Sequence, residues 1–269
     1  MDNKLLVKNI NFKTLPKMFE LKNEINIIAG PCSVESMEQM EKVAQKLVEN
    51  NIKFIRGGAF KPRTSPYDFQ GLGMEGIEIL RYICKKYSLL SVSEITDVRN
   101  VEKALNYIDI IQIGSRNMQN TDLLKEVGKS KHPVLLKRGM MSTLNEFLMA
   151  AEYIVSNGNN EIMLCERGIR TIEDSTRNTL DISSVAIIKK ETSLPVIVDL
   201  SHSLGRKDIL IPVAKAIIAL GIDGIMLEIH NNPSEALSDS KQQLSLDEFQ
   251  TFYDAIVPCL YKKDDNKAS

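Results

Sequence analysis

Several cations follow short apolar runs of this sequence, where they could bind anionic ligands. They are Arg56, Lys61, Arg63, Arg116, Lys137 and Arg167. Cations gathered in one place are costly unless anions neutralise them, and the arginine fork suits phosphate and carboxylate groups. If the fold brings these side chains together, we expect the ligands to be small polyanions that carry as many as two phosphates.

A second group of residues offers metal ligands. Its members are Cys32, His202, Glu228, His230 and Asp239. Thiolate, imidazole and carboxylate together suit a first-row divalent ion such as Mn, Fe, Co or Zn. Spacing along the chain does not choose between His202 and His230. For Cys32 alone, a small buried apolar residue is the alternative interpretation.

Eight apolar runs of strand length must position these residues, and they alternate with amphipathic segments of helix length. The predicted strands are 25–30, 54–59, 89–95, 109–115, 133–139, 161–167, 194–201 and 224–230. Capping-box spacings that begin at Ser36, Thr143 and Ser245 predict helix starts. Repeated strand–helix units imply a parallel sheet, and eight of them favour a closed (β/α)8 TIM barrel. An open doubly wound sheet is the alternative, since order in the sequence does not prove closure.

The predicted strands stay apolar until their last residues, where polar or charged side chains begin. Barrel enzymes build their active sites at the carboxyl ends of the strands. Strands often end in polar loop residues, but that alternative predicts polar residues at both ends. The N-terminal ends carry fewer charges here, so the pattern favours a functional site at one mouth of the barrel.

Length and composition bound the class of protein. The chain has 269 residues, with 34 basic and 35 acidic side chains, and is 43% hydrophobic. Balanced charge gives no electrostatic reason to bind nucleic acid, and no apolar run approaches the roughly 18–20 residues that cross a bilayer. The first 24 residues lack the apolar stretch of a signal peptide, and the four cysteines form no CxxC pair. We therefore expect a cytoplasmic protein with free thiols and no nucleic-acid or membrane partner.

The catalytic barrel is predicted to be a single domain over residues 25–258. Residues 1–24 are too few for a domain, and Leu5, Val7, Ile10 and Phe12 predict a short strand or hairpin that closes the bottom of the barrel. Residues 259–269 are polar at their end and are predicted to form a disordered tail.

Several motifs, in this order, resemble one known family. They are Gly30-Pro-Cys-Ser-Val-Glu35, Arg56-Gly-Gly-Ala-Phe-Lys-Pro-Arg-Thr-Ser-Pro-Tyr67, Gln70-Gly-Leu-Gly73, Gln112-Ile-Gly-Ser-Arg-Asn-Met-Gln119, Lys137-Arg-Gly139, Cys165-Glu-Arg-Gly-Ile-Arg-Thr171 and Ala236-Leu-Ser-Asp239. Over residues 25–257 the chain resembles 3-deoxy-D-arabino-heptulosonate 7-phosphate (DAHP) synthase of the type I-beta class. The resemblance implies a TIM barrel that condenses phosphoenolpyruvate (PEP) with erythrose 4-phosphate and water and releases phosphate. That reaction is the first step of the shikimate pathway to chorismate and the aromatic amino acids.

The resemblance also implies roles for single residues. The implied metal ligands are Cys32, His202, Glu228 and Asp239, with Mn²⁺ first and Fe²⁺, Co²⁺ or Zn²⁺ as alternatives. The implied substrate-binding residues are Arg56, Lys61, Pro62, Arg63, Thr64, Ser115, Arg116, Lys137, Arg167 and Asp239. Within this set, Arg63 and Thr64 bind the sugar phosphate, and the other cations bind PEP. The implied catalytic residues are Lys61, Cys32 and His202.

Three residues depart from the family pattern. Leu200 and Asn231 replace usual prolines, and Ser240 replaces a usual glycine, which puts the loops around His202 and Asp239 in question. A homodimer or homotetramer is implied, and a separate chorismate mutase is a candidate partner.

Two other functions compete with DAHP synthesis. The nearest is 3-deoxy-D-manno-octulosonate 8-phosphate (KDO8P) synthase, which uses arabinose 5-phosphate and carries Lys-Ala-Asn-Arg-Ser where this chain has Lys61-Pro-Arg-Thr-Ser65. The pair Arg63-Thr64 favours the four-carbon sugar. The other is a catalytically silent barrel that binds PEP, although an inactive relative would typically have lost a metal ligand or a phosphate-binding arginine.

Overall fold

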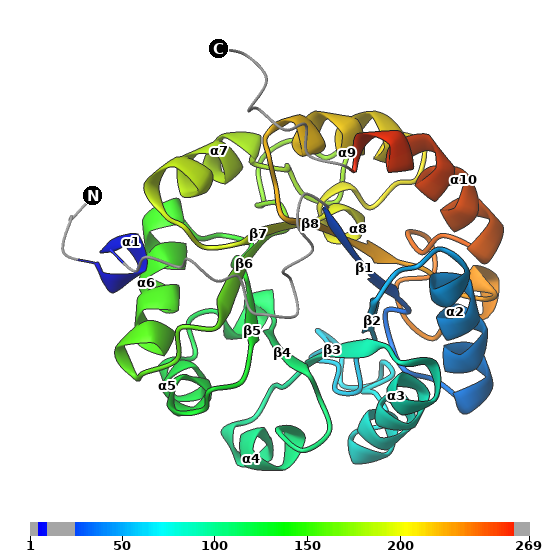
Figure 1. Cartoon of the computed structure of the whole chain (residues 1–269), viewed down its shortest axis with the longest axis horizontal. Coiled ribbons are helices and arrows are strands. Elements are labelled where there is room, and N and C mark those ends of the chain that lie inside the picture. Colours follow the sequence, from blue (N-terminus) through cyan, green and yellow to red (C-terminus); the bar gives the residue numbers. More distant parts are fainter. Residues whose placement is uncertain (1–4, 10–24, 261–269) are drawn as a thin grey trace.

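The computed structural model describes residues 5–9 and 25–260. Eight parallel strands close into a barrel in the order of the sequence (Figure 1). They are β1 (Asn26–Gly30), β2 (Phe54–Arg56), β3 (Leu90–Glu94), β4 (Ile110–Ile113), β5 (Val134–Lys137), β6 (Ile162–Glu166), β7 (Val196–Asp199) and β8 (Gly224–Glu228). Pairing of β1 with β8 along five residues closes the ring. The predicted TIM barrel is confirmed, and the open sheet is wrong.

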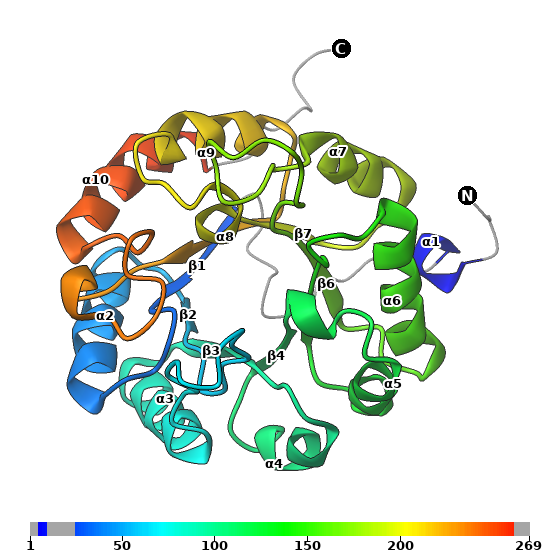
Figure 2. The ribbon, with the colours of Figure 1, turned by 180° about the vertical axis from the view of Figure 1, so that it is seen from behind.

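Helices surround the barrel. They are α2 (Met37–Glu49), α3 (Met74–Tyr87), α4 (Val101–Ala104), α5 (Thr121–Lys129), α6 (Leu144–Ser156), α7 (Ile182–Glu191), α9 (Leu210–Ala219) and α10 (Leu246–Ile256). The short helix α8 (Leu200–Leu204) follows β7 directly and lies beside β8 in both views (Figure 2). Single 3₁₀ turns are Val98–Asn100, Ser115–Asn117, Pro233–Glu235 and Val257–Cys259. No helix in the described ranges is long and apolar enough to cross a membrane.

The predicted helix starts are confirmed. Thr143 and Ser245 each form a full capping box with the glutamate three residues later. The Ser36 hydroxyl accepts a hydrogen bond from the Gln39 backbone N–H, whereas the Gln39 amide oxygen accepts from the backbone of Glu35. These caps satisfy free N–H groups of the first turns and thereby set where each strand-to-helix loop ends.

The predicted N-terminal strand is wrong where the structure describes it. Leu6–Asn9 form α1, a single helical turn that packs on the outside against α6 (Figure 1). The Glu152 carboxylate of α6 accepts hydrogen bonds from the backbone N–H groups of Leu6 and Val7, and Val7 is fully buried. A carboxylate from a neighbouring helix stabilises this turn, and such a contact leaves no mark in local periodicity. The rest of the predicted hairpin and residues 261–269 lie outside the described residues.

The interior of the barrel is filled by a layer of apolar side chains. Its members are Ile28, Phe54, Val92, Ile110, Leu135, Met163, Cys165, Ile197 and Met226. Side chains two residues apart point to the same face of a strand. The next inward positions toward the carboxyl ends are therefore Arg56, Glu94, Gln112, Lys137, Asp199 and Glu228. The apolar layer thus forms the floor under a polar layer at the mouth of the barrel.

Candidate active site

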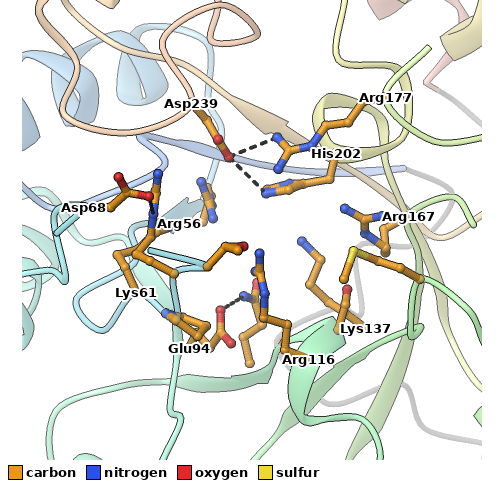
Figure 3. A pocket seen from close by; sticks show the side chains of 17 residues that line it. Arg56, Lys61, Asp68, Glu94, Arg116, Lys137, Arg167, Arg177, His202 and Asp239 are labelled. Carbon is orange, nitrogen blue, oxygen red and sulfur yellow. Dashed lines mark hydrogen bonds and ion pairs between the residues drawn. The ribbon is translucent and has the colours of Figure 1, made fainter. Parts of the chain in front are cut away.

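A cavity opens at the carboxyl ends of the strands (Figure 3). Its lining includes all of the predicted substrate-binding residues, namely Arg56, Lys61, Pro62, Arg63, Thr64, Ser115, Arg116, Lys137, Arg167 and Asp239. His202 also lines it. The fold therefore brings to one mouth the cations that are scattered over more than one hundred positions of the sequence.

The deepest cations of this cavity have incomplete sets of partners. Arg56 is buried and donates to Glu228 at 2.8 Å and to the carbonyl of Pro31 at 2.9 Å, but its Nε atom has no partner. Arg167 is buried as well, its Nη1 atom donates to the carbonyl of Gly168 at 3.3 Å, and its Nε atom lacks a partner. Buried N–H groups of a charged side chain are costly when unsatisfied. An anion in the cavity would satisfy them.

The predicted metal ligands also lie together. Ligand atoms of Cys32, Glu228 and Asp239 are all within 4.8 Å of one another, and Cys32 Sγ is 3.5 Å from Asp239 Oδ2. The His202 Nε2 atom is 3.5 Å from Glu228 Oε1 and 3.8 Å from Asp239 Oδ2. Thiol, imidazole and two carboxylates are a donor set that fits a first-row divalent ion.

His230 lies away from this cluster. Its Nε2 atom faces Glu35 at 3.3 Å, and its Nδ1 atom accepts from the backbone of Asn232. Strand alternation alone would place His230 on the same face as Glu228, but β8 ends at Glu228 and the alternation ends with it. The geometry therefore places His202, and not His230, beside the carboxylates.

Asp199 orients His202 from behind. Its carboxylate accepts from the backbone N–H of His202 at 2.9 Å and from Nδ1 at 2.8 Å, and it also contacts the Lys137 ammonium. Burial lowers the pKa of His202 even though the Asp199 charge opposes this, so the imidazole is neutral near pH 7. With the proton on Nδ1, the Nε2 lone pair faces Glu228 and Asp239, as a metal ligand requires.

The surroundings of the Cys32 thiol favour its protonated form. Burial, followed by the Glu228 charge, raises the pKa of Cys32 to about 11, although Lys61 opposes the shift from 3.1 Å. A metal binds the thiolate rather than the thiol, so an incoming divalent ion must displace this proton.

The three departures from the family pattern leave the loops in a workable geometry. Leu200 is buried as the first residue of α8, a position that suits proline but does not need it. The left-handed backbone in this loop falls on Asp239, with φ of 47°, and not on Ser240, so glycine is not required there. The Oδ1 atom of Asn231 is buried without a partner, for which nothing in the structure gives a reason.

Glu94 is a cavity residue without a predicted role, although its place at a strand end could be read from the sequence. Its Oε2 atom is 3.5 Å from Gln112 Nε2, and its Oε1 atom is buried without a partner. A side chain at Gly114 would place its Cβ atom 1.9 Å from Glu94 Oε1, so the glycine makes room for this carboxylate. Burial raises the pKa of Glu94 against the opposing charges of Lys61 and Lys137.

Arg177 was missed entirely by the sequence analysis. It lies in the long loop between β6 and α7, and its Nη1 atom is 3.1 Å from Asp239 Oδ2 (Figure 3). This loop has no periodic pattern, so nothing in the sequence indicates which of its polar residues turns inward. Asp68 and Met140 are further lining residues that were not predicted.

A family model described as the DAHP synthetase I family matches residues 19–260. The chain belongs to this family. It is 55% identical over 224 residues to a phospho-2-dehydro-3-deoxyheptonate aldolase of Thermotoga maritima, an alignment that covers 83% of this chain and 66% of that protein. The chain therefore spans about two thirds of the length of this relative.

Solved structures of the family have the same fold. A crystal structure of the Thermotoga maritima DAHP synthase superposes with a TM-score of 0.84 at 49% identity, over 90% of this chain and 71% of that chain. A truncated form of the Thermotoga enzyme gives a TM-score of 0.81 at 47% identity and covers 90% of each chain. A 2-dehydro-3-deoxyphosphooctonate aldolase of Syntrophotalea carbinolica is more distant, at 31% identity over 83% of this chain and 86% of that protein.

Proposed function

We propose that this protein condenses PEP with erythrose 4-phosphate and water to give DAHP and phosphate, the first step of the shikimate pathway. The observation that carries the proposal is one cavity whose arginine and lysine side chains lie directly beside a thiol, imidazole and carboxylate cluster. Two phosphorylated anions repel each other, and a cationic cavity can hold both in reacting geometry. The DAHP synthase relatives support the same reaction.

The proposal includes a divalent ion held by Cys32, His202, Glu228 and Asp239, with Mn²⁺ as the first candidate and Fe²⁺, Co²⁺ and Zn²⁺ as alternatives. When bound, such an ion would supply a Lewis acid for the aldehyde oxygen of the sugar. Asp199 and Gln242 support the ligands, since Asp199 orients His202 and the Gln242 amide donates to Glu228 at 2.5 Å.

PEP would occupy the deep end of the cavity. Arg56 and Arg167 each offer an unpartnered Nε there, and the buried Lys137 lines the same cavity. We propose that Lys137 bridges the carboxylate and phosphate ends of PEP while Arg116 and Lys61 complete the site. These contacts would orient C3 of PEP toward the aldehyde carbon.

The sugar phosphate would occupy the outer end. Arg63 and Thr64 lie in the loop after β2, and the side chain of Arg63 is only weakly engaged, 3.4 Å from Asp68. Pro62 and Asp239 would lie near the sugar hydroxyls. In this arrangement, the length of the sugar sets whether its phosphate reaches Arg63.

Glu94 suits the step that uses water. When C3 of PEP bonds to the aldehyde carbon, positive charge develops at C2, and the oxygen of a water adds there. We propose that Glu94 accepts the proton of this water, because Glu94 lines the cavity, its Oε1 atom has no hydrogen-bond partner, and its raised pKa makes it a stronger base than an ordinary glutamate. Cleavage of the bond between C2 and the bridging oxygen then releases phosphate.

Substitution Glu94→Gln is expected to lower kcat about 100- to 1000-fold, because a positioned base is lost while the shape of the side chain is kept. The KM for PEP should stay within about threefold of the parent. Glu94 must be ionised to act, so the activity of the parent should fall as the pH drops through the raised pKa of Glu94. The pH–rate profile of the variant should lack this acidic limb. Steady-state kinetics from pH 5 to 9 would measure both effects.

The surface substitution Glu126→Gln, which removes a carboxylate paired with Lys129 on α5, is the matched control. An unchanged kcat in Glu94→Gln would contradict the proposed role of Glu94.

Substitution Arg63→Ala is expected to weaken use of the sugar and spare PEP. A charged hydrogen bond to phosphate contributes about 1.5–3 kcal/mol, so kcat/KM for erythrose 4-phosphate should fall about 10- to 150-fold. The KM for PEP should stay within about threefold. Initial rates with each substrate varied in turn would show this, and a defect confined to PEP would mean that the loop is assigned wrongly.

Phosphate release is the experiment that tests the proposed reaction class. The protein with Mn²⁺ should release phosphate when PEP and erythrose 4-phosphate are both present, and should release none with either alone. Absence of turnover under these conditions would favour the catalytically silent barrel.

We also propose a homodimer or homotetramer in the cytoplasm, with a separate chorismate mutase as a candidate partner. The family resemblance supports the oligomer, and free thiols at Cys32, Cys84, Cys165 and Cys259 are in keeping with a reducing compartment. Sedimentation velocity, with and without the mutase, would measure both associations.

A further inference from the structure

Arg177 joins the candidate metal cluster to the open part of the cavity, and the proposed reaction gives it no role. Its Nη1 atom donates to Asp239 Oδ2 at 3.1 Å and to Gln242 Oε1 at 2.5 Å. Figure 3 shows the Asp239 carboxylate facing both the Arg177 and the His202 side chains. The Arg177 side chain is 37% exposed, so its charged end lies at the rim of the cavity.

The backbone at the base of Arg177 is held firmly. Its N–H donates to the carbonyl of Leu204 at 2.9 Å, and the N–H of Asn178 donates to the carbonyl of Ser203 at 2.8 Å. Gly205 packs against this segment, because a Cβ atom there would lie 2.4 Å from Cβ of Arg177. The base of the side chain is therefore fixed beside α8, which carries His202, while its long stem would let the guanidinium turn once its bonds to Asp239 and Gln242 are broken.

Cys32, Glu228 and Asp239 each have a cation beside them, which for Asp239 is Arg177. Arg56 pairs with Glu228 at 2.8 Å, and Lys61 donates to Cys32 Sγ at 3.1 Å. Arg56 is buried, with 5% of its side chain exposed. Arg177 also lines an open groove on the far side of Asp239, between the loops before α7 and after β8. Arg177 thus has space to move that the buried Arg56 lacks.

Asp239 holds a partly buried negative charge beside a cation. Its side chain is 21% exposed, and its Oδ2 atom pairs with the Arg177 guanidinium at 3.1 Å. The Asp239 Oδ2 atom that accepts from Arg177 is also the atom 3.5 Å from Cys32 Sγ and 3.8 Å from His202 Nε2. A divalent ion bound among these atoms would take the oxygen that Arg177 holds.

We propose that Arg177 is a built-in counter-cation, which occupies Asp239 when no divalent ion is bound and is displaced toward the anionic sugar when the ion binds. The identity of the sugar rests on the proposed function, whereas the competition between Arg177 and the ion does not. Because Arg177 lines the same cavity as Arg63 and Thr64, the displaced guanidinium lies within the space that the sugar phosphate would use. Binding of the ion and of the sugar would then favour each other by the same factor.

Isothermal titration calorimetry of the metal-free protein with Mn²⁺ alone tests the competition between Arg177 and the ion. Arg177→Met keeps the stem that packs against Gly205 and removes the charge, so Mn²⁺ should bind about 5- to 30-fold more tightly than to the parent. Arg177→Gln should show a gain of the same sign, which keeps the test decisive if the methionine variant folds poorly. Unchanged or weaker Mn²⁺ binding in the variants would overturn the proposal.

Arg206→Met is the matched control, because Arg206 lines the same groove but pairs with Asp208, at 2.7 and 2.6 Å, and not with Asp239. It removes the same charge, and its Mn²⁺ affinity should stay within about twofold of the parent. A gain in Arg206→Met equal to that in Arg177→Met would mean that net charge alone is responsible, and would overturn the specific role of Arg177.

Binding of erythrose 4-phosphate without PEP tests the displacement. Saturating Mn²⁺ should tighten sugar binding to the parent and should have no such effect in Arg177→Met. An equal effect of Mn²⁺ in both proteins would overturn the displacement toward the sugar. If the parent binds no erythrose 4-phosphate at all, the proposed function fails, and the titration with Mn²⁺ alone still decides the competition.

Discussion

Replacing Lys137 by methionine is expected to lower kcat/KM for PEP about 100- to 1000-fold, the range for loss of a positioned charge in an active site that excludes water. Lys137 is buried at the end of β5, and its ammonium contacts the Asp199 carboxylate at the floor of the cavity. Methionine fills a similar volume, so the shape of the cavity should remain. Steady-state kinetics with PEP varied would measure the loss.

The same substitution should destabilise the fold, because the buried Asp199 carboxylate loses the Lys137 ammonium and keeps the His202 imidazole, which is neutral near pH 7. Breaking a buried ion pair costs about 3–5 kcal/mol, and denaturant unfolding without substrates would measure this. Lys129→Met on α5 removes an exposed lysine and should change neither quantity by much. A Lys137→Met protein with parental kcat/KM would contradict the proposed PEP site.

Removal of divalent ions is expected to abolish turnover. EDTA should lower the rate about 1000-fold or more, since a Lewis acid contributes several kcal/mol, and added Mn²⁺ should restore it. Cys32→Ala should bind Mn²⁺ more weakly and should recover little activity. Cys84→Ala is the control, because that thiol is buried in α3 and lies outside the cluster. Full activity of Cys32→Ala in chelator would contradict the metal site.

The affinity for Mn²⁺ should also depend on pH. The Cys32 thiol has its pKa raised to about 11, so below that pH each ion bound through the thiolate releases a proton. Apparent affinity should therefore rise as pH increases from 6 to 9, by up to about tenfold per pH unit for one proton released. In Cys32→Ala, the apparent affinity for Mn²⁺ should change less with pH.

The barrel could be predicted because each strand leaves its own mark on the sequence. Apolar runs and helix-start residues are local signals, and all eight predicted strands are present. Several predicted strands are too long. In the second strand, for example, the residues after Arg56 stay apolar, but the strand ends at Arg56, and the N–H groups of Gly57 and Gly58 donate to the carbonyls of Val92 and Cys32. The turn at Leu6–Asn9 was mispredicted because its stability depends on Glu152, far away in the sequence.

The site could be predicted in part for the same reason. Residues at the carboxyl ends of the strands lie close together because the strands are parallel and the barrel is closed. The polar layer of Arg56, Lys137 and Glu228 follows from the alternation of side chains along each strand. Arg177 lies in a loop whose path is set by contacts with α8, which no local pattern encodes. The choice between His202 and His230 likewise depends on where β8 ends and on the hydrogen bond from His202 to Asp199.

A competition between the two sugars tests the proposed reaction most directly. The protein with Mn²⁺ and PEP would be given erythrose 4-phosphate and arabinose 5-phosphate at equal concentration, and the products would be separated by mass. The seven-carbon sugar acid 7-phosphate should dominate by at least about tenfold, because the extra carbon displaces the phosphate from the fixed Arg63 and Thr64 pair. A dominant eight-carbon product would contradict the assignment of the sugar site, and the absence of either product would contradict the proposed reaction itself.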